Sequence, residues 1–223
     1  GFFVLLGDDL ERYYTRAGNF GFDTNGYLVN TATGLKVLGW QDKENYTVPS
    51  DKSPQSIDAI QIRKGMMIPS RATTEVNFSK NLNAEAGSGS YSIPFRVYDS
   101  LGCAHNLTIT FSKAVGYENI WNYTISTDDP NGNITSGATG TLEFSSSGEL
   151  VNHSGDNVVF TPNNGADDIT FSIDFSGVTQ YTKETNVDMT YQDGYSSGTL
   201  TGITTDVTGT ITGIFDNGLI RKL

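Results

Sequence analysis

The stretch GFFVLLGDDLERYYTRAGNFGFDTNGYLVNTATGLKVLGW, residues 1–40, decides the fold class. Short runs of aromatic and β-branched residues alternate in it with Gly, Asn and Asp, which suit tight turns, so it predicts a β-meander. Asn25-Gly26 predicts a type I′ hairpin turn, in which both central residues need a positive φ. The stretch holds neither His nor Cys, and no Gly-rich phosphate-binding loop leads into a helix. It therefore carries no enzymatic motif.

Size and composition agree with a β fold. The chain has 223 residues, enough for one large or two modest domains. Its 25 Gly residues, together with frequent Thr, Ser and Asn, are typical of a turn-rich all-β protein. No apolar run approaches the roughly 18–20 residues that span a bilayer, and no signal peptide opens the chain. We therefore expect an all-β protein without membrane insertion.

The charge balance argues against two classes of partner. The chain has 14 Lys and Arg against 25 Asp and Glu, a net charge of −11. Nucleic acids and anionic membranes are bound by concentrated Lys and Arg, and the sequence has no basic stripe with interleaved aromatic residues. We therefore expect neither partner, and we attribute the acidity to solubility.

The rest of the chain divides into sections of different style. Residues 41–56 are polar with two prolines and predict a loop, and residues 57–62 alternate as a short strand. Residues 71–178 predict seven or so strands of a sandwich or small barrel, and their clearest period of two covers 169–175. This section holds 12 acidic residues against 4 basic ones. Residues 179–223 return to the Gly-rich style of the first forty.

Motifs that could carry chemistry lack the context that each requires. Residues 194–198, GYSSG, fit G-x-S-x-G, but strand-like alternation follows them and both histidines, His105 and His153, precede them. The turns at 23–26 and 128–133 lack the 12-residue loop and closing Glu of an EF-hand calcium site. Because each histidine is isolated in the sequence, no catalytic, cofactor-binding or metal-ligating residue is predicted.

A single cysteine and several glycosylation sequons complete the candidate positions. Cys103 cannot form an internal disulfide, so we expect a small buried apolar side chain, with a bond to a neighbouring subunit as the alternative. Six asparagines precede x-Ser/Thr, but Asn, Ser and Thr are frequent enough here for chance matches. These are Asn45, Asn77, Asn106, Asn122, Asn133 and Asn152.

The order of residues at both ends of the chain resembles the axial-protein family of the bacterial flagellum, and within it the hook proteins. The opening pattern is Gly-Phe-Phe, Tyr-Thr-Arg-x-Gly-x-Phe, Asp-x-x-Gly-x-Leu-Val and Gly-Trp, and a closing GY…G.L…D..G.I.G…NG pattern follows after residue 193. The resemblance assigns family-pattern structural positions to Phe2, Phe3, Thr15, Arg16, Gly18, Phe20, Asp23, Gly26, Leu28, Val29, Gly39, Trp40, Gly194, Tyr195, Gly198, Gly209, Gly213, Asn217 and Gly218.

The resemblance implies a discontinuous inner β-domain, residues 1–70 plus 179–223, with an outer β-domain, residues 71–178, inserted into it. Rod proteins share the opening pattern but usually lack such an insertion, which favours a hook protein. The implied function is that of a structural subunit that assembles into a curved helical tube and transmits torque from motor and rod to filament as a universal joint. The sequence would then be a fragment without the terminal helical segments, expected to stay monomeric while the full-length protein polymerises.

The resemblance also implies partners and a location. The partners are copies of the chain itself, the rod and hook–filament junction proteins, and the hook cap, and no cofactor is implied. The location is extracellular, in the flagellar hook, after export by the flagellar type III pathway. Some hook proteins cross-link neighbouring subunits through a Cys and a Lys, and the alternative role of Cys103 would take this form.

A different interpretation is a secreted or surface-anchored, adhesin-like β-sandwich that binds a partner. It accounts for the β pattern and the sequons, but it does not account for the matched opening and closing stretches. The two hypotheses differ in chain order, because a binding module should have contiguous domains, whereas the hook interpretation requires 1–70 to pack with 179–223.

Overall fold

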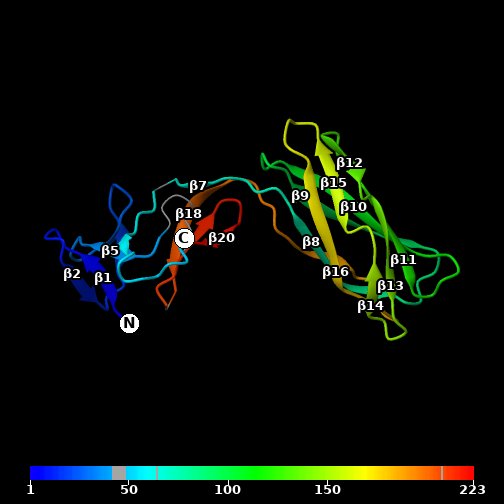
Figure 1. Cartoon of the computed structure of the whole chain (residues 1–223), viewed down its shortest axis with the longest axis horizontal. Coiled ribbons are helices and arrows are strands. Elements are labelled where there is room, and N and C mark those ends of the chain that lie inside the picture. Colours follow the sequence, from blue (N-terminus) through cyan, green and yellow to red (C-terminus); the bar gives the residue numbers. More distant parts are fainter. Residues whose placement is uncertain (42–48, 64, 207) are drawn as a thin grey trace. The chain divides into compact units, whose positions relative to one another are not determined.

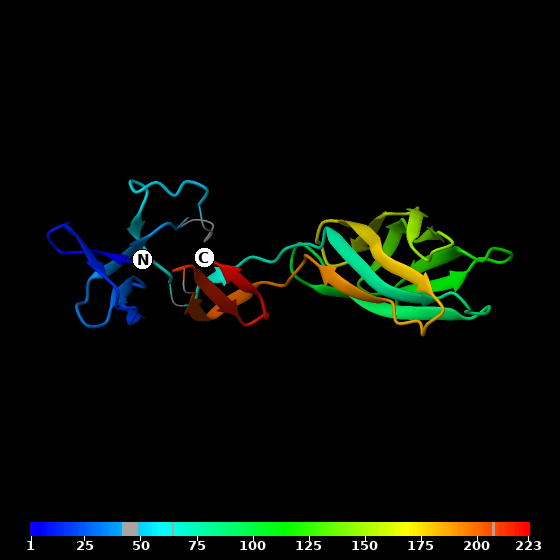
Figure 2. The same ribbon diagram turned by 90° about the horizontal axis from the view of Figure 1, so that it is seen from below.

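The computed structural model describes residues 1–41, 49–63, 65–206 and 208–223. In these ranges every regular element is a β-strand, and no helix is long and apolar enough to cross a membrane. The chain forms two compact units (Figures 1 and 2). Unit 1 comprises Gly1–Ile68 and Gly198–Leu223, and unit 2 comprises Pro69–Ser197. The predicted all-β fold class is therefore confirmed.

The second boundary between the units lies later in the chain than the sequence pattern indicates. Residues 179–197 belong to unit 2 and not to the discontinuous unit. The reason is strand pairing, because β16 (Ile169–Tyr181) runs past residue 179 and β17 (Asp188–Gln192) pairs with β8 (Glu75–Asn83). As a consequence, Gly194 and Tyr195 of the closing pattern lie in unit 2.

Unit 1 contains two small antiparallel sheets. One has the strand order β2-β1-β5-β4-β3, with β6 paired to β5, and the other has the order β20-β19-β18-β7. The strands are β1 (Phe3–Leu6), β2 (Arg12–Thr15), β3 (Phe20–Phe22), β4 (Leu28–Asn30), β5 (Lys36–Gly39), β6 (Asp58–Ala59), β7 (Met67–Ile68), β18 (Gly198–Thr205), β19 (Ile211–Phe215) and β20 (Ile220–Lys222).

The first forty residues depart from the predicted meander in their pairing. β1 lies between β2 and β5, so the first strand pairs with the fifth as well as with the second. The strand expected over 57–62 is regular only at β6, although the backbone of Ile60 exchanges hydrogen bonds with Leu28 and Val37. Of the predicted loop 41–56, residues 42–48 lie outside the described residues.

The hairpin turn at Asn25-Gly26 is not of type I′, and that prediction is wrong. Leu10 and Lys80 are the non-Gly residues with positive φ in the described part of the chain, so Asn25 does not supply the positive φ that type I′ requires. Instead, the Asp23 carboxylate accepts the N–H groups of Asn25 and Tyr27, and Gly26 alone has a positive φ of 82°. A side-chain acceptor therefore replaces the second positive-φ residue.

Unit 2 is a sandwich of two five-stranded sheets, ordered β14-β13-β11-β10-β9 and β12-β15-β16-β8-β17. Apart from the parallel pair β8 and β16, the paired strands in it are antiparallel. Its remaining strands are β9 (Ser90–Tyr98), β10 (Ala104–Lys113), β11 (Ile120–Ser126), β12 (Gly132–Ser136), β13 (Thr139–Phe144), β14 (Leu150–His153) and β15 (Asn157–Pro162).

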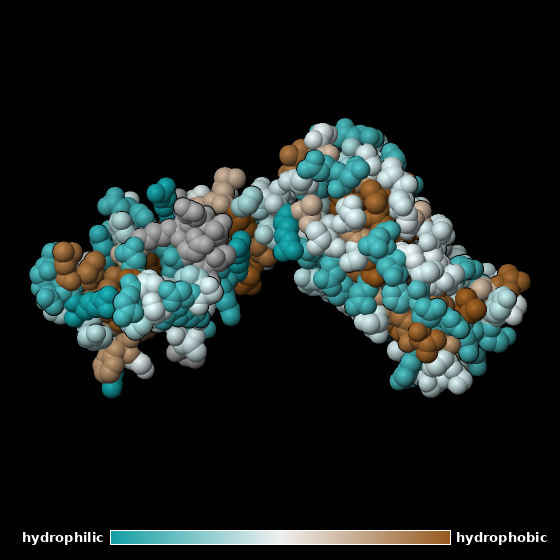
Figure 3. All heavy atoms as spheres, viewed as in Figure 1, coloured by the Kyte–Doolittle hydropathy of each residue, from teal (hydrophilic) through white to brown (hydrophobic). Residues whose placement is uncertain are grey.

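The inward-facing residues of both sheets form one apolar core in unit 2. Alternate residues of β16, such as Phe171 and Phe175, are fully buried, as the period of two requires. Phe78 contacts the edge of Phe95 at 5.4 Å and stacks on Phe175 at 5.8 Å between ring centroids. On the face seen in Figure 3, hydrophilic and neutral residues cover most of unit 2 and apolar residues gather only in small groups. Unit 2 therefore has an apolar interior of its own.

Candidate functional sites: an apolar cavity and a buried polar network

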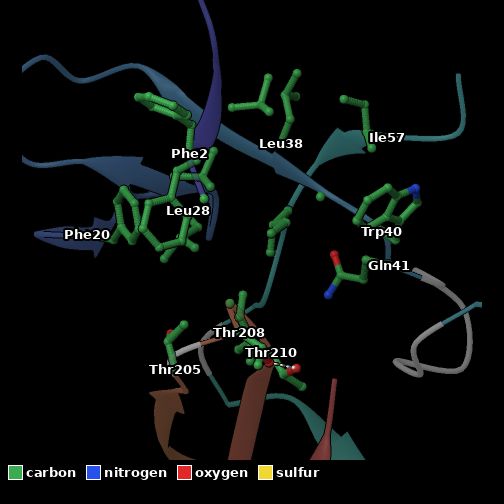
Figure 4. Close-up of a pocket in the computed structure, with 18 of the residues that line it drawn as sticks. Phe2, Phe20, Leu28, Leu38, Trp40, Gln41, Ile57, Thr205, Thr208 and Thr210 are labelled. Atoms are coloured by element: carbon green, nitrogen blue, oxygen red, sulfur yellow. Dashed lines mark hydrogen bonds between the residues drawn. The ribbon is translucent and has the colours of Figure 1, made fainter. Parts of the chain in front are cut away.

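An open apolar cavity of about 670 Å³ lies in unit 1. Its lining comes from both sheets, and Figure 4 shows Phe2, Phe20 and Leu28 on one side and Thr205, Thr208 and Thr210 across from them. Several positions of the family pattern line it, namely Phe2, Phe3, Phe20, Leu28, Gly39, Trp40 and Gly209. The cavity therefore gathers residues that are far apart in the sequence.

The cavity is surrounded by aromatic rings that remain partly open to solvent. Phe3 meets Phe20 edge-on with ring centroids 4.7 Å apart, which fixes both rings between β1 and β3. Phe2 stays 59% exposed beneath the guanidinium of Arg16, 4.7 Å from its ring centroid. Trp40 is 38% exposed, and its indole N–H donates to the Ser53 carbonyl at 2.9 Å. Such rings bury further apolar area when another surface covers them.

Gln41 adds an unusual polar group to this cavity. Its Oε1 accepts the Gln61 N–H at 2.9 Å, whereas its buried Nε2 finds no hydrogen-bond partner among the described residues. In Figure 4 its amide lies beside the cavity. A buried donor without a partner costs about 1–3 kcal/mol, so the cavity offers a donor that a carbonyl oxygen would satisfy.

The other family-pattern positions hold turns and close backbone approaches. In unit 1, a Cβ on Gly26 would lie 2.7 Å from the Ile62 carbonyl oxygen. In unit 2, a Cβ on Gly194 would meet Thr73, and Tyr195 exchanges backbone hydrogen bonds with Arg71. The remaining positions supply a turn residue, a side chain that accepts a backbone N–H, a strand residue or a close contact. They are Thr15, Gly18, Asp23, Val29, Gly198, Gly213, Asn217 and Gly218.

A second feature, a buried polar network in unit 2, surrounds His105. The His105 ring is fully buried, and its Nδ1 lies 2.8 Å from Asp129 Oδ2 while its Nε2 lies 3.1 Å from Asp99 Oδ2. Asn164 donates its amide N–H to the same Asp99 oxygen at 2.6 Å. Both ring nitrogens of His105 thus face carboxylate oxygens.

Hydrogen bonds keep the two carboxylates of this network ionised. Burial acts to raise the pKa of Asp99, but hydrogen bonds from Asn164, His105 and Cys103 outweigh it and hold that pKa below its ordinary value. Burial likewise acts to raise the pKa of Asp129, and hydrogen bonds from Asn131 and His105 lower it overall. The network is therefore a buried cluster in which both oxygens of Asp99 already accept hydrogen bonds.

Possible ligand atoms of Asp99, Cys103 and His105 all lie within 4.8 Å of one another. The Asp99 oxygens already accept four hydrogen bonds, two from backbone N–H groups and two from side chains. No lone pair of that carboxylate is directed at an ion, so the geometry is that of a structural network. Cys103 is exposed, which corrects the expectation that it is buried.

The remaining sequence candidates stay apart from this network. Residues 194–197 lie in the connection between β17 and β18, and Gly198 begins β18, so this motif is not at a strand-to-helix elbow. His153 Nδ1 contacts the Asp156 carboxylate at 2.7 Å on the partly exposed side of β14. Of the sequons, Asn45 lies outside the described residues, whereas Asn106 and Asn122 lie within strands.

Sequence reasoning missed the network because it treated His105 as isolated. A signal was present, since Asp99 follows β9, His105 lies near the start of β10, and Asp129 follows β11. Consecutive antiparallel strands bring these three points to the same end of a sheet. The strand order was needed to recognise this.

Comparison with known proteins places the chain among flagellar proteins. The family model for the flagellar basal body protein FlaE D2 domain matches residues 67–195, and the model for the flagellar hook protein FlgE/F/G D1 domain matches residues 1–81. The flagellar hook protein FlgE of Treponema pallidum is 27% identical over 100% of this chain and 59% of its own length. That of Escherichia coli is 31% identical over 97% of this chain and 56% of its own length.

The fold also has a solved counterpart. The crystal structure of Helicobacter pylori flagellar hook protein FlgE2 superposes with a TM-score of 0.65 at 14% identity, covering 100% of this chain and 85% of that one. At this identity the likeness supports the fold alone. The chain thus spans less than three fifths of the length of the two relatives above, and nothing among the comparisons supports the adhesin-like alternative.

Proposed function

Because this chain belongs to the flagellar hook protein family, we propose that it acts as a structural subunit of the hook, assembling with copies of itself into a curved helical tube. The observation that carries the proposal is the order of the two matching family models, which together extend over residues 1–195. Identical subunits that meet through head-to-tail contacts which do not close generate an open helical assembly.

The distribution of charge supports different roles for the two units. Unit 2 has 15 acidic and 5 basic residues, whereas unit 1 has 10 acidic and 9 basic residues. Copies of a strongly acidic unit repel one another, while a nearly neutral unit approaches its copies without that cost. We assign unit 1 to the body of the tube and unit 2 to its outer surface.

The open apolar cavity of unit 1 is consistent with that assignment. Half-exposed rings such as Phe2 and Trp40 gain stability when protein covers them, at about 25 cal/mol per Å² of apolar area removed from water. The family-pattern positions then keep the turns and close approaches of unit 1 in the shape that assembly requires. We propose that the cavity is covered in the assembled hook.

The two units also suit a universal joint. Each has its own packed interior or sheets, so neighbouring copies can exchange surface contacts as the tube bends without opening a core. The same contacts transmit torque from rod to filament. The rod proteins, hook–filament junction proteins and hook cap would be met at the ends of the tube, and export by the flagellar type III pathway would bring the subunit there.

The proposal is tested by expressing the full-length protein in a bacterial strain that makes no hook protein of its own. We expect curved hooks in electron micrographs, and we expect the 223-residue chain alone to sediment as a monomer. A matched pair of variants separates the units: Trp40→Ala at the cavity should reduce hook number, whereas Val115→Ala, at a side chain 98% exposed on unit 2, should not. Failure of the unchanged full-length protein to restore hooks would contradict the proposal.

A further inference from the structure

Two segments carry the chain into and out of unit 2. The incoming segment is 70–74, the outgoing segment is 193–197, and the backbones of Arg71 and Tyr195 join them through hydrogen bonds of 2.9 and 3.0 Å. The Asp193 carboxylate accepts the Thr74 N–H and hydroxyl at 2.7 and 2.6 Å and pairs with Arg71 at 2.8 Å. These contacts hold the incoming and outgoing segments side by side.

Residues 98–103 of unit 2, the last residue of β9 and the loop after it, contact this pair, which β16 also holds through the Ser172 N–H bonded to the Thr74 carbonyl at 2.9 Å. Ser70 donates its hydroxyl to the Ser100 carbonyl at 2.7 Å, and the Thr73 N–H donates to the Tyr98 carbonyl at 2.9 Å. Gly102 lies so close that a Cβ there would be 2.8 Å from Ser70 Cβ and 3.2 Å from Ser196 Cα. The shape of this loop is thus one of the constraints that position the incoming and outgoing segments.

The shape of the loop depends in turn on the Asp99 carboxylate. Asp99 Oδ1 accepts the N–H groups of Leu101 and Cys103 at 2.9 and 2.8 Å. Asp206 makes the same pair of bonds in unit 1, to the N–H groups of Thr208 and Thr210 at 2.8 and 2.9 Å. Asp206 is exposed, whereas Asp99 is fully buried and bound to His105 and Asn164.

Several ionisable groups meet in the network around Asp99. The groups that face His105 are the carboxylates of Asp99 and Asp129 on its nitrogens and the Phe160 ring at 4.7 Å, with the Cys103 thiol near the same carboxylate. A protonated carboxyl offers one acceptor site fewer to the N–H groups that bind it. Because the cluster is buried, water cannot replace the lost contacts without opening the loop.

We propose that Asp99, His105, Asp129 and Asn164 form an acid-sensitive latch that holds the incoming and outgoing segments on unit 2, and that protonation of its carboxylates releases them while the core stays folded. The inference concerns unit 2 itself and does not depend on the proposed role in the hook.

The pH window follows from the two carboxylates. Their pKa values are lowered in the folded protein, so the stabilisation is complete above the unfolded value of about 4 and is lost as the pH falls through the lower folded values. The latch is therefore closed at neutral pH and opens in acid. Release should begin below about pH 4.

Hydrogen exchange of the full chain between neutral pH and about pH 2.5 tests the latch, with protection factors used to remove the intrinsic effect of pH. We expect protection at 70–74 and 193–197 to fall about 10-fold or more before the core strands β10 and β16 lose any. Simultaneous loss in segments and core would overturn the proposal, and so would unchanged protection of the segments throughout.

A pair of variants gives a second, independent measurement. Asp129→Asn keeps a carbonyl acceptor for His105 Nδ1 but removes the charge, and it should lower protection of the two segments at neutral pH. Asp206→Asn removes the carboxylate charge of the matching exposed turn in unit 1 and should leave those segments unchanged. Equal protection of the segments in both variants would refute the latch. If Asp129→Asn does not fold, the acid titration of the unchanged protein decides.

Discussion

Replacing Gly102 by Ala measures how tightly the latch loop fits against the incoming and outgoing segments. Gly102 has a φ of +84°, where an L side chain costs about 1–2 kcal/mol. The added Cβ also lies 2.8 Å from Ser70 Cβ and 3.2 Å from Ser196 Cα, which cannot rotate away. Overpacking of this kind costs about 1–3 kcal/mol. We therefore expect Gly102→Ala to lower the free energy of unfolding of unit 2 by about 2–5 kcal/mol in all.

Gly165→Ala is the matched control for this measurement. Gly165 belongs to the same unit and has a φ of +86°, but a Cβ there would meet nothing within 4 Å. The control therefore carries the same backbone strain without the contact. Urea unfolding followed by the fluorescence of the buried Trp121 gives both free energies. We expect the free energy of unfolding to fall by about 1–3 kcal/mol more in Gly102→Ala than in Gly165→Ala. Equal decreases in the two variants would refute the close fit.

Three further outcomes test the core, the carboxylates and the cavity. Phe78→Ala, at a ring 1% exposed, should lower the free energy of unfolding of unit 2 by about 3–5 kcal/mol in denaturant. Phe2→Ala, at a ring 59% exposed, should cost under about 1 kcal/mol. Similar decreases would contradict the assigned core. Burial acts to raise the pKa of Asp193, but its hydrogen bonds and Arg71 lower that pKa overall. The stabilisation from this carboxylate should therefore vanish below about pH 4 and be missing in Asp193→Asn. A variant whose stability depends on pH as strongly as that of the unchanged protein would contradict this role of Asp193. Iodide should quench Trp40 but not Trp121 in the free chain, and assembly should protect Trp40; persistent quenching in assembled hooks would show that the cavity stays open.

The long strands could be predicted from the sequence because their burial follows a strict period of two. β10, β11 and β16 each place apolar side chains on one face and polar ones on the other, and the core contains the predicted faces. The short strands β12 and β14 escaped prediction, and β17 lies beyond the predicted section 71–178, so unit 2 has ten strands and not seven or so. Their positions are determined by the strands they pair with, since their own residues are largely polar or exposed.

The boundary after residue 178 could not be located from residue style. No residue of β17 is buried, and the strand lies just before the Gly-rich closing segment, yet it completes a sheet of unit 2 by pairing with β8, more than 100 residues earlier in the chain. Pairings of such separation depend on the whole fold and leave no local pattern.

The two candidate sites could be predicted from the sequence to different degrees. The aromatic and Gly positions around the cavity were recognised through the family pattern, although nothing local predicts that a Cβ on Gly209 would lie 3.8 Å from the Phe3 ring. The network around His105 required knowledge of which strand ends are neighbours. Asp99, Asp129 and Asn164 come from polar turns and His105 from β10, and burial strengthens the interactions among them.

The most direct test of the account is an electron cryo-microscopy map of hooks assembled from the full-length protein, with the two units fitted separately. We expect density for unit 1 in the wall of the tube, with the cavity around Phe2 and Trp40 covered by protein, and density for the acidic unit 2 on the outer surface. A map in which unit 2 forms the wall, or in which the tube contains a different protein, would contradict it.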